Sequence, residues 1–459
     1  MKHQKPEAGR MENGLTKRLA QYVVDADYET VPAEVIHAAK RCLIDWLGVA
    51  LGGSSHPGVD SLLQVADRVG CSNQATIIGR KRKTDSLHAA LINGYMSHVL
   101  DYDDTNLESF VHPSAPVWPA ISALSSTTTV SGKEALLAFV MGYEVENRIG
   151  RVLFKHHDER GWHMSGMVGG FGAAAAVGKI MTLNGSQMRQ AFGIAATYAS
   201  GLREMFGTMS KSLHPGKAAM SGLYAALLIQ AGFTSSENVL ETPRGFFAVN
   251  AGEYHLEAVL AGIGKNFGIL KNSVKPYSCG VVVHPTVDGI ISLRNREKIQ
   301  PHEVSKIEAE VHPMVPDVTG KTTPKTGIDG KFSIYHCMAA ALVDGACGPD
   351  QFSDKRVHAP EIVSIRELTA IRVNPDFRHE EARVVIHLKN GKKFEAHIPH
   401  ASGTPQNPVT DEHLFEKYMS MAGKVIGADK ARTLADKIWM LEEIDDFQKI
   451  MALTAPVQV

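Results

Sequence analysis

The stretch MVGGFGAAAAVGKIMTL, residues 167–183, decides the fold of this chain. Eight of its seventeen residues are glycine or alanine, and residues 188–202 form a second segment rich in small side chains. The distance between packed helices depends on the side chains at their contact, so small residues allow a close approach. We therefore predict that both segments are helices at the centre of a helical bundle.

Helical patterns continue outward from this centre over most of residues 30–264. A helix is predicted to begin at Pro32, which suits the first turn, and to end at Gly52 and Gly53, which are stop signals. Apolar residues recur three and four positions apart in further segments, as expected for helices with one buried face. These helices are predicted over residues 86–100, 132–153 and 217–231.

The pattern changes after about residue 265. Residues 304–311 and 365–373 alternate between apolar and polar positions, which is typical of strands. Residues 382–398 form the clearest hairpin, because Asn390-Gly391 would supply the positive φ angles of a type I′ turn. A helix at 331–343 lies between these strands, and residues 410–459 return to helix. The chain is therefore predicted to be mainly α, with a smaller α+β domain.

Composition excludes several classes of protein. The 459 residues include 48 Lys+Arg and 49 Asp+Glu, a net charge of −1, so no basic stripe for nucleic acid is expected. A long uncharged stretch, residues 218–236, contains Ser, Gln and Thr, which argues against a membrane span. The first ten residues are charged, unlike a secretory signal. We expect a cytoplasmic protein that binds neither nucleic acid nor membrane.

The cysteines are few and widely spaced, and no pair has C-x-x-C spacing. Such spacing predicts neither a disulfide framework nor an iron–sulfur cluster, which would need three or four convergent thiolates. We expect reduced thiols that form no cluster. The five are Cys42, Cys71, Cys279, Cys337 and Cys347.

Four polar stretches supply the candidates for chemistry. The first holds Asp101, Thr105 and His112, on a loop that follows a predicted helix. Loops on a rigid scaffold commonly carry functional sites, and a carboxylate can orient a histidine for acid–base work. A solvated acidic loop would give the same pattern.

The second stretch places His163 directly before the small-residue helix. The helix dipole disfavours a charged imidazole at that end, so His163 would be a neutral base near pH 7. A structural or surface histidine is the alternative. The charged run at residues 156–159, HHDE, is interpreted as an exposed loop, because consecutive residues rarely converge on one ion.

The third and fourth stretches are FGTMSKSLHPGK, residues 206–217, and KPYSCG, residues 275–280. Lys211 lies within an otherwise uncharged part of the third, and burying an unpaired ammonium is costly. An anionic ligand would explain it, and a lysine that extends to solvent is the alternative. The fourth stretch, followed by His284, belongs either to a lid over a pocket or to a simple hinge.

Together the four stretches resemble the MmgE/PrpD family. The motifs DYDDTNLESFVHPS, GWHMSGMVGGFGAAAA, FGTMSKSLHPGKAA and KPYSCGVVVH occur in the family's order, and the similarity spans nearly the whole chain. It implies a large all-helical domain built from both chain ends, residues 1–268 and 404–459, plus a smaller α+β lid domain, residues 269–403. It also implies a homodimer, with neither a metal ion nor an organic cofactor.

The resemblance also implies an active site between the two domains and a small di- or tricarboxylate substrate. The family's reactions move a proton at a carbon next to a carboxylate. Lys211 would pair with a carboxylate or donate a proton, and Asp101 would hold one imidazole in its useful tautomer. By motif match, the catalytic residues are Asp101, His112, His163 and Lys211, and the substrate-binding residues are Thr105, Tyr277 and His284.

The family includes 2-methylcitrate dehydratase, cis-aconitate decarboxylase and iminodisuccinate epimerase. This chain has Gly280 and Asp317 where the decarboxylases carry a histidine and a tyrosine. The resemblance therefore favours a cofactor-independent lyase that dehydrates a 2-methylcitrate-like acid. The alternatives are an epimerase of an iminodisuccinate-like dicarboxylate, a cis-aconitate-type decarboxylase and, from another class, a non-catalytic carboxylate-binding protein.

Overall fold

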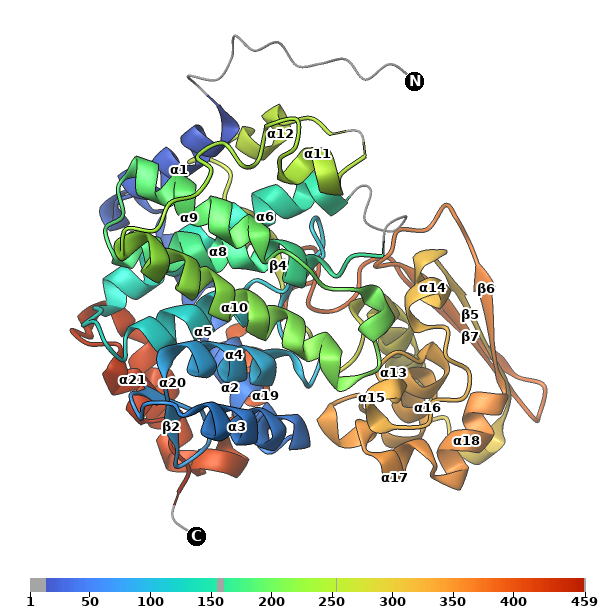
Figure 1. Cartoon of the computed structure of the whole chain (residues 1–459). Helices are drawn as coiled ribbons and strands as arrows, with labels where there is room; N and C mark the ends of the chain where they lie inside the picture. Colours follow the sequence, from blue (N-terminus) through green and yellow to red (C-terminus); the bar gives the residue numbers. More distant parts are fainter. Residues whose placement is uncertain (1–13, 155–160, 253, 458–459) are drawn as a thin grey trace.

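The computed structural model describes residues 14–154, 161–252 and 254–457, and helices dominate this part of the chain (Figure 1). Its buried side chains form two large hydrophobic cores. The larger core combines residues 15–274 with residues 414–451, so the C-terminal helices pack beside N-terminal ones. The smaller core spans residues 279–388. The predicted mainly α fold class is confirmed.

The centre of the larger core is formed by α4 (Ser86–His98), α5 (Ser114–Leu124), α8 (Met164–Ile180) and α10 (Met209–Gln230). Helix α10 packs against the other three. A Cβ on Gly94 of α4 would lie 2.7 Å from the Cα of Gly216 in α10, and a Cβ on Gly222 of α10 would lie 2.4 Å from the Cβ of Ala173 in α8. Small residues are therefore required where these helices cross.

Further helices surround this centre, and α6 packs along α8. They are α1 (Leu15–Asp25), α2 (Ala33–Gly53), α3 (Pro57–Val69), α6 (Gly132–Phe154), α9 (Gly185–Thr197), α11 (Phe246–Asn250), α12 (Glu257–Leu260), α19 (Asp411–Ile426), α20 (Ala428–Trp439) and α21 (Gln448–Ala452). Two short antiparallel pairs join segments of this part: β1 (Ala75–Thr76) with β2 (Lys83–Thr84), and β3 (Thr105–Asn106) with β4 (Asn272–Ser273).

Helix α10 begins eight residues before its predicted start, so that prediction is wrong. The predicted start lies just after Pro215, a residue that lacks the N–H needed to bond the oxygen of Lys211. In the structure Thr208 caps the helix, its side chain accepting from the N–H of Ser210 at 3.2 Å. The helix continues through the proline, and Lys211 consequently lies in its first turn.

The smaller part contains a four-stranded sheet in the order β6–β5–β7–β8. Strands β5 (Val304–Val311) and β6 (Thr369–Val373) are parallel, whereas β7 (Ala382–Leu388) pairs antiparallel with β5 and with β8 (Lys393–Ile398). Alternate residues of β7 are buried, and α13 (His284–Glu297) packs on β7 and β8. The other helices are α14 (Met314–Thr319), α15 (Gly327–Gly330), α16 (Ile334–Asp344), α17 (Asp354–Val357) and α18 (Pro360–Glu367).

Two local predictions for this part are wrong in detail. Residues 365–373 do not form one strand, because α18 occupies the chain as far as Glu367 and buries Ile362 and Ile365, three positions apart. The 382–398 hairpin exists, but only Gly391 has a positive φ (84°). Its N–H donates to the Leu388 oxygen at 3.0 Å, as in a three-residue loop that ends in a left-handed glycine.

None of the helices that the structure describes is long and apolar enough to cross a membrane. The charged run at residues 156–159, predicted to be an exposed loop, lies outside the described residues.

Candidate active site

A pocket opens where the two parts of the molecule meet. The helical part contributes a polar wall, which is flanked by Phe110, Trp162, Met164 and Phe206, and the smaller part contributes a largely apolar wall. The polar wall contains five of the predicted residues: Asp101, Thr105, His112, His163 and Lys211. The apolar wall includes Val281, Val282, Met314, Val318 and Phe332. The fold therefore gathers the predicted polar residues, although Asp101 and Lys211 are 110 positions apart.

The loop after α4 carries Asp101 and Thr105. Asp101 has a left-handed backbone (φ 48°), a conformation that few residues other than glycine adopt. Phe110, farther along the same loop and also in the pocket wall, shares it (φ 51°). Thr105 in β3 pairs with Ser273 in β4, and the chain after β4 then brings Lys275 to Asp101.

Asp101 is held between two buried lysines. Lys211 Nζ donates to Asp101 Oδ2 at 3.0 Å, and Lys275 Nζ donates to Oδ1 and to the Asp101 backbone oxygen. Burial alone would raise the pKa of the Asp101 carboxyl, but the two ammonium groups outweigh it and hold that pKa well below its usual range. Burial lowers the pKa of Lys211 despite the opposing charge of Asp101. Lys211 therefore gives up a proton more easily than a solvated lysine.

The backbone of this loop is also fixed by buried lysines. Three of them donate to the oxygens of three consecutive residues: Lys331 to Leu100 (2.6 Å), Lys275 to Asp101 (3.2 Å) and Lys417 to Tyr102 (2.7 Å). These lysines come from three distant segments of the chain. The position of Asp101 thus depends on the assembly of both cores and not on the loop alone.

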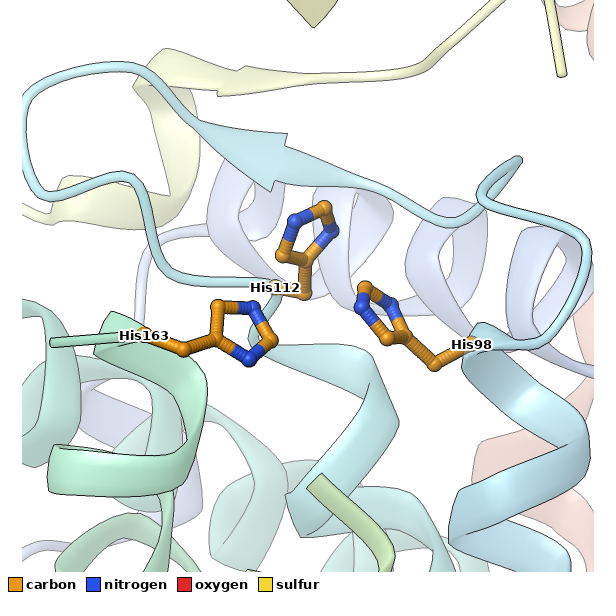
Figure 2. Close-up of side chains that lie close together, drawn as sticks. All are labelled: His98, His112 and His163. Carbon is orange, nitrogen blue, oxygen red and sulfur yellow. The ribbon is translucent and has the colours of Figure 1, made fainter. Parts of the chain in front are cut away.

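Three buried histidines lie close together next to this loop (Figure 2). His98 is the last residue of α4, His112 precedes α5, and His163 is the N-cap residue of α8. The ring centroids of His98 and His112 are 4.5 Å apart, and those of His98 and His163 are 5.5 Å apart. Three elements of the bundle thus contribute one imidazole each.

The carboxylate of Asp103 determines the tautomers of His98 and His112. Asp103 Oδ2 lies 2.7 Å from His98 Nδ1 and 3.2 Å from His112 Nδ1. His112 Nδ1 also lies 3.0 Å from the backbone oxygen of Asp104. These oxygens can only accept when the carboxylate is ionised, so both Nδ1 atoms carry the hydrogen and both Nε2 atoms keep a lone pair. Burial would raise the pKa of Asp103, but the two imidazoles outweigh it and hold that pKa well below its usual range.

Burial keeps all three imidazoles neutral near pH 7. It lowers the pKa of His98 to about 3, despite the charge of Asp103. It also lowers the pKa of His112 and that of His163, where the Lys211 ammonium adds to the effect. His163 Nδ1 lies 2.9 Å from His214 Nδ1, so a fourth ring supports it. His112 and His163 line the pocket, where a neutral imidazole can accept a proton.

The structure does not bring every predicted residue to the pocket. Thr105 lines the pocket, and its Oγ1 lies 3.1 Å from His112 Nδ1. Tyr277 and His284, predicted to bind substrate, are absent from the pocket wall. The Tyr277 hydroxyl donates to Asp288 Oδ1 at 2.6 Å, and His284 packs against the Tyr277 ring. Their side chains turn into the smaller core, which explains the difference.

Of the two positions that differ from the decarboxylase pattern, Gly280 and Asp317, only Gly280 lies in the pocket wall. Gly280 is part of the pocket wall, so at this position the wall is backbone without an imidazole. Asp317 is not part of the wall, but its carboxylate bonds the Arg203 guanidinium at 2.6 Å. Arg203 itself lines the pocket. Asp317 therefore acts on the pocket through an arginine.

Four residues of this site are not among those predicted from the sequence: His98, Asp103, Arg203 and Lys275. Asp103 and Lys275 stand inside the motifs that were singled out, so their charge was a usable signal. His98 lies three positions before Asp101, but the turn of α4 that carries it gives no sign of facing a pocket. Arg203 lies just outside the third motif, and only the fold brings it to the wall.

The three histidines are also a possible metal site, since each offers a nitrogen within 4.8 Å of the others. His98 Nε2 is buried and has no hydrogen-bond partner. The Lys211 ammonium, however, disfavours positive charge on His163, and it would repel a metal cation at the same place. The arrangement therefore suits proton transfer better than metal binding.

Two family models match most of the chain. The MmgE/PrpD N-terminal domain matches residues 17–258, and the MmgE/PrpD C-terminal domain matches residues 277–443. Curated relatives include a cis-aconitate decarboxylase of Aspergillus terreus, 26% identical over 471 residues that cover 96% of both chains. The cis-aconitate decarboxylase of Mus musculus is 26% identical over 430 residues, covering 90% of this chain and 87% of the relative. Because the family models cover both parts of the molecule, the chain belongs to the MmgE/PrpD family.

Proposed function

We propose that this protein is a lyase that acts on a small di- or tricarboxylate by proton transfer at a carbon next to a carboxylate. The observation that carries the proposal is the polar wall of one pocket, where Lys211 and the neutral imidazoles of His112 and His163 meet. Membership of the MmgE/PrpD family and the names of the curated relatives support lyase chemistry.

The geometry suggests a division of labour within the pocket. Lys211, Lys275 and Arg203 line it, whereas Asp101 is the one carboxylate among its described lining residues. This excess of cations would attract the carboxylates of a substrate. His112 Nε2 would accept the proton from carbon, and Lys211, with its lowered pKa, would return a proton to the reacting group. The apolar wall would exclude water from the reacting carbon.

Two specific reactions follow from different observations. Decarboxylation of a cis-aconitate-like tricarboxylate is supported by the names of the curated relatives. Dehydration of a 2-methylcitrate-like hydroxy acid is supported by Gly280, because the pocket wall there lacks the imidazole that the decarboxylase pattern includes. Dehydration needs a base for the carbon-bound proton and an acid for the departing hydroxyl, which His112 and Lys211 would supply. Decarboxylation needs only an acid that protonates the carbon losing carbon dioxide, and Lys211 would supply that proton.

The experiment that tests this proposal is a substrate panel. Chelator-treated protein is incubated separately with cis-aconitate, 2-methylcitrate and iminodisuccinate, and the products are identified by NMR with a parallel assay of released carbon dioxide. We expect turnover of one tricarboxylate by loss of carbon dioxide or water. Racemisation of iminodisuccinate alone would replace the lyase by an epimerase. Binding without any turnover would mean a carboxylate-binding protein.

A further inference from the structure

Three cysteines that are far apart in the sequence converge inside the smaller core. Cys279 precedes the pocket residue Gly280, Cys337 lies on α16, and Cys347 follows that helix. All three are free and buried, and their sulfur atoms lie within 4.8 Å of one another. The expectation that the cysteines form no cluster is therefore wrong, because α16 folds back against the segment that carries Cys279.

The thiols have weak partners in this arrangement. Cys337 Sγ lies 3.7 Å from the Gly330 oxygen, and Cys347 Sγ lies 4.0 Å from the Cys337 oxygen. A thiol is a weak donor, so little is lost when such contacts are exchanged for metal–sulfur bonds.

A buried cation next to the cluster provides the second observation. Lys331 is fully enclosed, and its ammonium donates to the oxygens of Leu100 and Ser278 and to the Ser278 hydroxyl. No carboxylate of the described residues lies within ion-pair distance of it, and the groups of negative or potentially negative charge that act on it are Asp101, Cys279 and Cys347. An enclosed ammonium is costly without an anion. The Asp101 carboxylate is already bonded to Lys211 and Lys275, so thiolates are the further anions that this neighbourhood can supply.

We propose that Cys279, Cys337 and Cys347 form a binding site for one thiophilic d¹⁰ cation, Zn²⁺ by preference. Sulfur atoms about 3.8 Å apart would surround a tetrahedral zinc ion with bonds of about 2.3 Å, a separation compatible with three sulfur atoms that all lie within 4.8 Å of one another. An iron–sulfur cluster would hold its thiolates farther apart and does not fit. Each thiol would lose its proton to solvent on binding. Three thiolates and Zn²⁺ carry a charge of −1, which the Lys331 ammonium offsets.

The site has a candidate for its fourth ligand. His284 is buried, its Nε2 lies 3.4 Å from the Cys279 backbone oxygen, and its ring neighbours the Cys279 thiol. Three cysteines and one histidine are a common ligand set of structural zinc sites. His284 does not belong to the group of atoms within 4.8 Å of one another, so its imidazole would turn toward the sulfur atoms on binding. The bound ion would tie Cys279, and with it the pocket residue Gly280, to α16. The inference is independent of the reaction proposed above.

Titration of the intact, metal-free chain with Cd²⁺ tests this inference. We expect one equivalent to bind with the ultraviolet charge-transfer band of cadmium thiolates, and Zn²⁺ to displace it. The Cys337→Ala variant should bind more than about tenfold more weakly. The matched control is Cys71→Ala, which removes a cysteine outside the cluster and should bind as the wild type does.

Two measurements on the wild type keep the test independent of how the variant folds. Co²⁺ should give the visible bands of a tetrahedral thiolate site, and Zn²⁺ should raise the melting temperature of the wild type and of Cys71→Ala. The absence of a thiolate band with either Cd²⁺ or Co²⁺ would overturn the proposal. So would a band of unchanged strength in a folded Cys337→Ala variant.

Discussion

At Asp101 the backbone adopts a strained conformation that places its carboxylate between two ammonium groups. A non-glycine residue in the left-handed region costs about 1–3 kcal/mol, and such strain persists where the surroundings over-determine it. Lys211 and Lys275 bind the side chain, and Lys275 also binds the backbone oxygen. The strain is thus retained at a residue of the candidate site.

The buried imidazole of His98 makes stability depend on pH. Its pKa is about 3 in the folded protein and about 6.5 in the unfolded chain. Between these values the unfolded chain binds a proton that the folded protein does not. Stability is therefore lost as the pH falls below about 6.5, by up to about 1.4 kcal/mol per pH unit.

The His98→Gln variant should show a weaker dependence of this kind. Urea unfolding at about pH 7 and about pH 5 measures this dependence. Near the lower pH, the number of protons bound on unfolding should be smaller by close to one in the variant than in the wild type. His214 contributes to the pH dependence of stability in the same direction, because burial lowers its pKa to about 4. This contribution is present in both proteins. An identical pH dependence in the two would contradict the neutral, buried state of His98.

Motif matching identified five residues of the site that the spacing of residues along the chain would not have identified by itself. Asp101, Thr105, His112, His163 and Lys211 do meet at one pocket. The other residues were missed or misplaced because their positions depend on tertiary pairing. The two-residue strands β3 and β4, for example, are too short to give a periodic signal, yet they bring the second ammonium group, that of Lys275, to Asp101.

At the element scale, helices α2 and α19 are joined by a buried ion pair. Lys417 Nζ donates to Asp45 Oδ1 at 2.6 Å and to the Tyr102 oxygen at 2.7 Å. The Lys417→Met variant would leave the Asp45 carboxylate buried without a counter-charge, a loss of roughly 3–5 kcal/mol. Urea unfolding should measure this loss in the free energy of unfolding.

Two further variants show whether the charge itself is responsible. Lys424→Met on the same helix removes an exposed lysine, whose contact with Asp350 is 3.5 Å, and should cost less than about 1 kcal/mol. Adding Asp45→Leu to Lys417→Met should recover most of the loss. Equal, small losses in Lys417→Met and Lys424→Met would contradict the account.

The crossing of α4 and α10 sets the distance between the elements that carry His98 and Lys211. A Cβ on Gly216 would lie 2.4 Å from the Leu91 oxygen and 2.9 Å from the Tyr95 nitrogen, both backbone atoms. The Gly216→Ala variant should therefore lose about 1–3 kcal/mol of stability.

The matched control for this crossing is Gly423→Ala in α19. The nearest atom that the added Cβ would meet there, in the side chain of Met419, is 3.9 Å away. Alanine there should stabilise the helix by about 0.5–1 kcal/mol. Thermal unfolding of both variants distinguishes the two sites. A Gly216→Ala protein as stable as the wild type would show that the helices need no such contact.

The helices and strands were predicted correctly where a long segment had a clear local pattern, and incorrectly where the local signal was ambiguous. The small-residue helices and the 382–398 hairpin are present. The start of α10 was misjudged at Pro215, and the strand at residues 365–373 was extended into α18. In both cases tertiary packing, which a local pattern does not contain, determined where the element begins.

At the scale of the whole molecule, the family resemblance predicts a homodimer. The chain has a mass of 49.8 kDa, so sedimentation velocity should give one species with twice that mass. A species of single-chain mass at micromolar concentration would contradict the prediction. The predicted domain boundaries after residues 268 and 403 stay a prediction, which limited proteolysis would test.

The pocket between the two parts is proposed to move protons on a small polycarboxylate. The most direct test compares turnover of the substrate found in the panel by the wild type, by Lys211→Met and by Lys179→Met. Lys179 bonds the Val24 and Ala26 oxygens and lies outside the pocket wall, so it controls for loss of a half-buried lysine. We predict that Lys211→Met lowers kcat by about 10²–10⁴-fold and that Lys179→Met retains it. Equal turnover by the wild type and a folded Lys211→Met protein would contradict the account.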